Sequence, residues 1–214
     1  ISRIAALAQS FRDGDLLPRI FPYQNNGFGY ASPLFYSNTF LVLPALCALA
    51  GLSIARCYQL LLLLCSFFTC FNMGLLMRRV TEKKEAVFLA ALLYLLCSYR
   101  LTDIYVRGAV GEVIALTFFP IALIGIVEVL YGQPQRWGWL TAGFSALLLS
   151  HNISFLLGCL MLLGFLALRI RTLRAQPQRL KAIVKATVAA IGLCAFFLFP
   201  MLEQMSAQTL YVHS

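Results

Sequence analysis

Charged residues are scarce in this sequence: Asp, Glu, Lys and Arg together make up 12% of its 214 residues. About a quarter of an ordinary soluble domain is charged. Hydrophobic residues account for 61% of the chain, and its mean hydropathy is +0.83. A soluble fold of this size cannot bury so much apolar surface, so we expect an integral membrane protein. The composition excludes a cytosolic enzyme, a secreted disulfide scaffold and a disordered tail.

The residues of metal sites and of common catalytic motifs are also scarce. There are only two histidines, and the sequence contains no P-loop, nucleophile elbow, H-E-x-x-H motif or C-x-x-C pair. Its seven cysteines lie mostly inside apolar runs, where we expect them as small buried hydrophobic side chains. The sequence therefore indicates neither a zinc site nor a disulfide framework, and it points to no particular cofactor.

Positive charge, in contrast, is in excess: 17 Lys and Arg against 8 Asp and Glu give a net charge of +9. In a soluble protein this excess would suggest a nucleic-acid partner. In a membrane protein, basic residues mark cytoplasmic loops, and here long apolar runs separate the basic segments. We therefore expect contact with membrane lipids and no nucleic-acid binding.

The apolar runs predict an all-α, polytopic bundle of about six spans. They cover residues 58–77, 86–97, 113–131, 137–149, 155–168 and 182–200. Residues 137–168 are predicted to form a hairpin, because one helix of that length would be about 48 Å long against a hydrocarbon core of roughly 30 Å. We place the bundle at residues 58–214 and expect it to belong to a longer chain with further spans at both ends.

Residues 1–57 are predicted to form an outer region with juxtamembrane helices. Residues 1–11 carry a helical stripe of apolar side chains, which suits a helix on the membrane surface. Residues 13–36 interleave turn residues with aromatic ones, which is typical of a loop at the membrane–water interface. The apolar segment 38–51 is short and contains Pro44, so we favour a helix that does not cross the membrane. The alternative is that it crosses and that the preceding loop is cytoplasmic.

The distribution of basic residues predicts the orientation of the bundle. Eleven of the 17 basic residues fall at residues 78–84, at Arg136 and at residues 169–185. The positive-inside rule places these segments in the cytoplasm. Residues 99–112 and 150–154 then face the outside, and the short runs beside them draw their polar side chains towards the membrane plane. At that depth, polar side chains must line a cavity or be buried in protein.

The richest polar segment is residues 99–112. In a helix, Arg100, Asp103 and Arg107 share one face, so two guanidinium groups would flank one carboxylate. Such an arrangement can clamp a phosphate and leave the acid for proton transfer. The alternative is a structural ion pair between Asp103 and Arg107 that merely neutralises itself.

Further candidates lie around this group. Glu112 is either a second functional acid or a favourable acid at a helix N-terminus. We expect Tyr99 and Tyr105 to line the substrate site. His151 and Asn152 lie at the tip of the predicted hairpin, where they would contact a phosphate or a sugar hydroxyl or exchange a proton. The alternative is that the side chains of this tip only hydrogen-bond to the backbone of the tip itself.

Three weaker candidates are Asp13, Asp15 and Glu203. Asp13-Gly14-Asp15 resembles a D-x-D metal clamp, which leaves a bound divalent metal open as an alternative. A polar turn after an amphipathic helix is the favoured interpretation of this segment. Glu203 follows Pro200 and would face the same outer cavity.

Three segments of the chain resemble one family of bacterial multi-spanning membrane proteins, which carries the label 6-pyruvoyl-tetrahydropterin synthase-related. The segments are DLLPRIFPYQNNGFGYASPLFY at residues 15–36, YRLTDIYVRGAVGE at residues 99–112 and LSHNIS at residues 149–154. The label does not imply pterin chemistry here, because a pterin synthase needs a soluble fold and a cluster of zinc-binding histidines.

The layout also resembles the GT-C glycosyltransferases, which have a large first outer loop with juxtamembrane helices and use lipid-phosphate-linked sugars. This resemblance implies an enzyme of the bacterial cytoplasmic membrane that transfers a sugar from a polyprenyl-phosphate donor to a cell-envelope acceptor at the outer face. The acid that such enzymes carry early in this loop would precede the first residue of the chain.

On this resemblance, Arg100 and Arg107 would bind the donor phosphate. Asp103 or Glu112 would act as a base or orient the acceptor hydroxyl, and His151 would assist. The alternatives are a transporter or flippase for a lipid-linked or anionic solute, and a non-catalytic membrane subunit.

Overall fold

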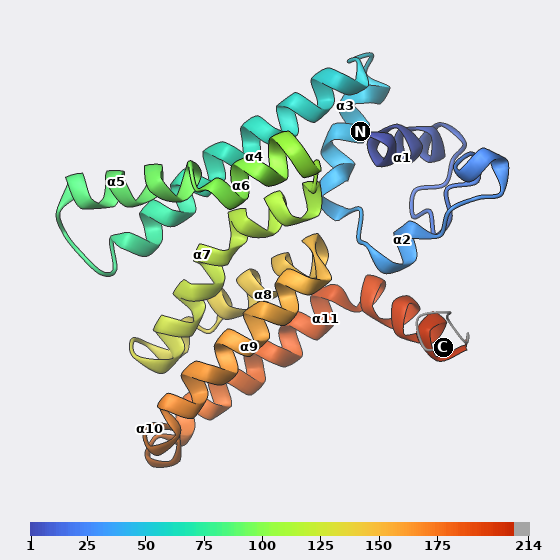
Figure 1. The fold of residues 1–214 in the computed structure, drawn as a ribbon. Helices are drawn as coiled ribbons and strands as arrows, with labels where there is room; N and C mark the ends of the chain where they lie inside the picture. The colour runs from blue at the N-terminus through green and yellow to red at the C-terminus, as the bar shows by residue number, and fades with distance from the viewer. Residues whose placement is uncertain (208–214) are drawn as a thin grey trace. The chain divides into compact units, whose positions relative to one another are not determined.

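A computed structural model describes residues 1–207, and the helices of these residues are shown in Figure 1. Within them the only β-structure is an isolated antiparallel bridge between Phe21 and Tyr30. The chain divides into two compact units: Ile1–Leu64 with the segment from Cys194 onward, and Cys65–Leu193. The last seven residues of the expected bundle, 208–214, lie outside the described residues. The expectation of an all-α polytopic membrane protein is confirmed.

Among residues 1–207, four helical segments are long and apolar enough to cross a membrane. Three are single helices: α4 (Ile54–Met77), α7 (Val110–Leu130) and α11 (Pro177–Ala207). The fourth, Lys84–Arg107, joins α5 (Lys84–Leu95), α6 (Ser98–Thr102) and the π-helical turn η3 (Asp103–Arg107). The short apolar run 86–97 therefore reaches membrane length only together with the polar segment that follows it.

The first unit begins with α1 (Ser2–Arg12), which packs against α3 (Val42–Leu49). Ile4, Leu7 and Ala8 are buried at this contact, so protein covers much of the apolar stripe that was expected on the membrane surface. Residues Thr39–Leu49, which comprise η2 (Thr39–Leu41) and α3, make a short apolar helix. At about 1.5 Å per residue this helix is too short to cross a hydrocarbon core of roughly 30 Å.

The loop between α1 and α3 turns where the sequence predicts it to turn. It contains η1 (Asn25–Gly27) and α2 (Ser32–Phe35), and five of its residues have a positive φ. Those residues are Gly14, Asn25, Asn26, Gly27 and Gly29. Tyr23 and Phe28 are 71% and 90% exposed, an exposure that suits the interface loop expected from the sequence.

The core of the second unit is α7, which packs against α8 (Gly138–Ser150) and α9 (Asn152–Leu168) (Figure 1). The two connections on either side of this hairpin contain η4 (Pro134–Arg136) and α10 (Ile170–Ala175). The hairpin predicted for residues 137–168 is confirmed, with His151 in extended backbone between α8 and α9. Gly125 of α7 faces the backbone of Leu140 so closely that no Cβ fits between them. Small residues therefore let α7 and α8 approach closely.

A proline inside α7 is accommodated by a neighbouring helix. Pro120 has no N–H, so it leaves the carbonyl of Leu116 without its helical donor. The Tyr94 hydroxyl of α5 donates to this carbonyl at 2.8 Å. Such replacement donors are what make a proline tolerable inside a membrane helix.

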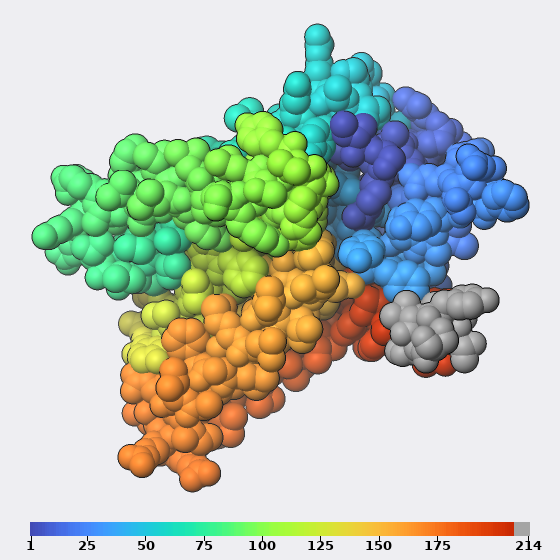
Figure 2. All heavy atoms as spheres, in the orientation of Figure 1, coloured from blue at the N-terminus to red at the C-terminus, as the bar shows by residue number. Residues whose placement is uncertain are grey.

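The outer helices of the second unit present apolar side chains to their surroundings. Phe88 and Leu93 of α5 are 70% and 63% exposed, and Leu157 and Leu163 of α9 are more than half exposed. Figure 2 shows α5 (green) and α9 (orange) at the molecular surface. Exposed apolar faces of this kind are expected of helices that contact lipid.

Candidate functional site

The predicted polar segment 99–112 forms a connected cluster at the start of α7. Arg107 lies at its centre: its Nη1 donates to Asp103 at 2.7 Å, and its Nη1 and Nη2 donate to the two oxygens of Glu112 at 2.9 and 2.7 Å. The Tyr99 hydroxyl also donates to Glu112. We call Tyr99, Asp103, Arg107 and Glu112 the Arg107 cluster.

Backbone geometry brings these side chains together. The wider π-helical turn η3 carries Asp103 at its start and Arg107 at its end, and π-helical turns are frequent at functional sites. Gly108 follows in a left-handed conformation with φ of +61°, which reverses the chain before α7. Glu112 then lies in the first turn of α7, where an acid also interacts favourably with the helix dipole. Both sequence interpretations of Glu112 are compatible with this position.

The two acids of the cluster differ in access. The side chain of Asp103 is fully buried, and its Oδ2 has no hydrogen-bond partner among the described residues. Glu112 is 12% exposed and lies beside Arg107, whose side chain is 47% exposed. A bound substrate would therefore reach Arg107 and Glu112 before it reached Asp103.

Arg107 is not saturated by its two carboxylates. Its contacts with Glu112 use Nη1 and Nη2, whereas none of the residues 1–207 accepts from its Nε. The edge formed by Nε and Nη2 therefore still offers donors to a ligand. Paired donors of this kind match the oxygens of a phosphate.

Arg100 has partners other than the one that helical spacing suggests. Its Nη2 donates to the Ser66 hydroxyl of α4 at 2.9 Å, and its Nη1 donates to the Leu95 carbonyl at 3.3 Å. The Leu95 carbonyl belongs to the last turn of α5, where carbonyls lack helical partners. Arg100 is 2% exposed, so it ties α6 to α4 and α5 instead of flanking Asp103 beside Arg107.

The tip of the hairpin lies against the start of α7, as the sequence predicts for two segments of one site. A Cβ added at Gly111 would lie 2.9 Å from the Ser150 carbonyl and 3.4 Å from the His151 ring. His151 caps α9, since its Nδ1 contacts the Ser154 hydroxyl at 2.9 Å and accepts from the Ser154 N–H at 3.4 Å. Burial lowers the pKa of His151, with Glu112 and Asp103 acting in the opposite direction. The imidazole is therefore neutral near pH 7.

The remaining candidates are dispersed. Tyr105 is 80% exposed, and Asn152 is the first residue of α9. Asp13 and Asp15 form a turn after α1, in which Asp13 accepts from Gln9 and Asp15 from the Leu17 N–H, as the favoured interpretation predicts. Glu203 is an exposed residue of α11. Among residues 1–207, no group of three His, Cys, Asp or Glu side chains is placed to hold a metal ion.

A second charged cluster lies at the opposite end of α7. Glu128 accepts from Arg79 at 3.0 Å and from Arg136 at 3.2 Å. Arg179 donates to the Val129 carbonyl at 2.7 Å. We call these residues the Glu128 cluster. It joins all three segments that the sequence predicts to be cytoplasmic, and sequence reasoning missed it. The sequence feature that could have indicated this cluster is Glu128 itself, because an acid at the end of a long apolar run needs a partner.

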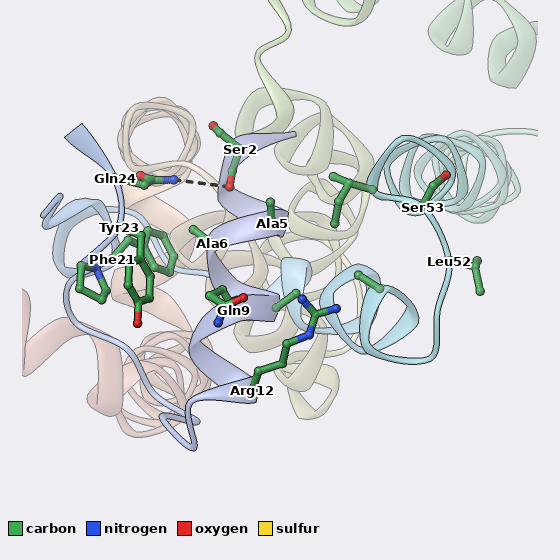
Figure 3. Close-up of a pocket in the computed structure, with 14 residues that line it drawn as sticks. Ser2, Ala5, Ala6, Gln9, Arg12, Phe21, Tyr23, Gln24, Leu52 and Ser53 are labelled. Atoms are coloured by element: carbon green, nitrogen blue, oxygen red, sulfur yellow. Dashed lines mark hydrogen bonds between the residues drawn. The ribbon is translucent and has the colours of Figure 1, made fainter. Parts of the chain in front are cut away.

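The first unit contains a cavity of about 530 Å³ between α1, the segment after Phe21 and the turn before α4 (Figure 3). Its lining includes alanines of α1 and the aromatic rings of Phe21 and Tyr23, and Gln9 and Arg12 of α1 supply polar groups. Gln24 donates to the Ser2 carbonyl at 3.4 Å, which connects the two sides of the cavity. No candidate from the sequence lines it.

Comparison with known proteins gives a family match over most of the chain. A family model described as "6-pyruvoyl-tetrahydropterin synthase related domain; membrane protein" matches residues 33–210. An uncharacterized protein from Lactococcus lactis subsp. cremoris (strain MG1363) is 26% identical over 219 residues, which cover 96% of this chain. The chain spans 35% of the length of that relative. No solved structure matches the chain significantly.

Proposed function

The chain belongs to the 6-pyruvoyl-tetrahydropterin synthase-related family of membrane proteins, and we propose that it is part of a GT-C-like glycosyltransferase. In this proposal the protein lies in the bacterial cytoplasmic membrane and takes a sugar from a polyprenyl-phosphate donor at the outer face. The acceptor is a hydroxyl group of the cell envelope. The family match supports the membrane location, and a relative from a bacterium supports the bacterial setting.

The observation that carries the proposal is the Arg107 cluster. It combines a half-exposed guanidinium that retains free donors with the carboxylate of Glu112, which is 12% exposed, at one end of a membrane span. Ionisable groups within membrane segments are costly and usually serve a function. A phosphate ligand and a proton acceptor side by side are what sugar transfer from a lipid phosphate requires.

The proposed step is a displacement at the anomeric carbon of the sugar. The acceptor hydroxyl oxygen forms the new bond to this carbon, while the bond from the carbon to the donor phosphate oxygen breaks. Glu112 takes the proton of the hydroxyl, and polyprenyl phosphate leaves as an anion whose charge Arg107 stabilises. No metal or cofactor is needed to balance the step.

In this proposal, the remaining candidates position Arg107 and Glu112 and take no direct part in the reaction. Asp103, buried beneath Arg107, fixes the guanidinium and is a positioning residue. Arg100, which the sequence assigned to the phosphate, instead anchors α6 through Ser66. His151 supports the cluster from the tip of the hairpin, next to Gly111.

Three substitutions in the full-length protein test these roles by radiolabelled sugar transfer and donor binding in membranes. Glu112→Gln should lower turnover by about 10²–10⁴-fold, the usual contribution of a general base, and leave donor binding intact. Arg107→Ala should weaken donor binding, because it removes the phosphate ligand. Asp103→Asn should lower turnover and let Arg107 move.

Glu203→Gln is the matched control, since Glu203 is an exposed acid outside the cluster and should retain wild-type turnover. If the cluster is only a structural ion-pair network, all three variants should lose stability without a selective loss of turnover. Full transfer activity in Glu112→Gln and Arg107→Ala would end the proposal for this site.

A further inference from the structure

A second candidate ligand site lies at the opposite end of α7 from the Arg107 cluster. It is a surface cavity of about 270 Å³ between the loop that precedes α8 and the beginning of α11. Its lining includes Gln135 and Trp137 from the loop, and Gln178, Lys181 and Lys185 from α11. We call it the Lys181 cavity. All of these residues belong to the second unit, so the cavity is defined within one compact body.

The cavity holds positive charge that no acid neutralises. Lys181 and Lys185 are four residues apart and therefore lie on one face of α11. Within the described part of the chain, the ion pairs involve Asp103, Glu112 and Glu128, and none of them includes either lysine. The two ammonium groups therefore favour an anion in the space between α11 and the loop.

Neighbouring basic residues are already engaged, which sets these lysines apart. Arg136 pairs with Glu128, and Arg179 donates to the carbonyls of Val129 and Gly132. These contacts connect Arg136 and Arg179 to the end of α7. No comparable hydrogen bond or ion pair within residues 1–207 involves Lys181 or Lys185, so their charge is available to a ligand.

The rest of the lining suits a lipid. Trp137 is a half-buried part of the lining, and tryptophan is enriched at membrane interfaces. Along the same face of α11, Val188 is 64% exposed, and nothing lies within 4 Å of a Cβ added at Gly192. One face of α11 therefore changes from charged to apolar along positions 181, 185, 188 and 192. A phospholipid lying along this face would place its headgroup at the lysines and its acyl chain at the apolar positions.

We propose that the Lys181 cavity binds the phosphate group of an anionic phospholipid in the cytoplasmic leaflet. The basic loops predict this side of the protein to be cytoplasmic, and basic pockets between membrane helices on that side suit anionic headgroups. The site is separate from the proposed transferase centre, so either proposal can fail without the other.

Native mass spectrometry of the purified full-length protein tests this site, with phosphatidylglycerol as the probe and phosphatidylcholine as the zwitterionic reference. The wild type should retain phosphatidylglycerol preferentially. Lys181→Gln combined with Lys185→Gln should reduce this retention by about tenfold, and the corresponding double substitution to Arg should preserve it.

Lys83→Gln combined with Lys84→Gln is the matched control. These two exposed lysines lie in another predicted cytoplasmic loop. Neither lines the Lys181 cavity, and Lys84 borders a separate cavity beside α5. Equal losses in both double variants would show a general charge effect and overturn the site. Inorganic phosphate at millimolar concentration should not displace the lipid. Displacement of the lipid by phosphate, or equal retention of phosphatidylcholine, would also overturn the lipid assignment.

Discussion

At the level of single residues, the sequence indicates that polar side chains gather between residues 99 and 112 but not how they are paired. Its alternative of an Asp103–Arg107 ion pair is found in the structure, with Glu112 and Tyr99 added to it. The pairing of Arg100 with Ser66 could not be foreseen, because it depends on how α4 packs. Tertiary contacts of this kind override the helical spacing that places Arg100 beside Asp103.

His151 provides a prediction about pH. Burial lowers its pKa in the folded protein below the value of about 6.5 expected in the unfolded chain. As pH falls through 6.5, the unfolded chain therefore takes up a proton that the folded protein resists, and the free energy of unfolding should decrease. His151→Asn keeps a cap acceptor for Ser154 but cannot titrate, so its stability should depend less on pH between 7.5 and 5.5.

Thermal unfolding of the full-length protein at the two pH values measures this effect. His151→Ala removes the cap and should cost about 1 kcal/mol at pH 7.5, and less at pH 5.5, where protonation destabilises the wild type but not the variant. An equal loss of stability on acidification in wild type and His151→Asn would show that another group is responsible.

At the level of elements, hydropathy and length predict the helices well and their breaks less well. The break at His151 follows from length alone, because residues 137–168 are too long for one span. The π-helical turn η3 leaves no such trace, since its sequence is compatible with an ordinary helix. The close approach of α7 and α8 is also hidden, because a glycine within an apolar run does not show which helix it faces.

Glycine substitutions test that close approach. Gly125→Ala should destabilise the protein by about 1–3 kcal/mol, because the added methyl group meets the backbone of Leu140, which cannot move aside as a side chain could. Gly164→Ala in α9 is the matched control, since its methyl group would meet nothing within 4 Å. The control should be neutral or more stable, because alanine favours helix. Equal unfolding temperatures for the two variants would contradict the packing described for α7.

At the level of the whole molecule, charge distribution predicts which loops share a side. The Glu128 cluster joins residues of all three segments that the sequence assigns to the cytoplasm, which supports their common side. The two compact units have their boundaries inside α4 and α11, whereas the division expected at residue 57, between an outer region and a membrane bundle, stays a prediction. Hydropathy is continuous along these helices, so the sequence carries no signal of such a boundary.

Cysteine accessibility tests the orientation. In a cysteine-free full-length protein, single cysteines at positions 83 and 174 should react only from the cytoplasm. Cysteines at positions 15, 102 and 152 should react with a membrane-impermeant reagent added outside. External labelling at position 83 would overturn the orientation and, with it, the outer location of the Arg107 cluster.

The most direct test of the central claim is an assay of the wild-type full-length protein in proteoliposomes, supplied with a radiolabelled polyprenyl-phosphate sugar and an envelope acceptor. The same sample reports sugar transfer to the acceptor and movement of the donor between leaflets. We predict transfer to the acceptor, with the donor consumed in the leaflet that the Arg107 cluster faces. Movement of intact donor across the bilayer without any transfer would contradict it and identify a transporter instead.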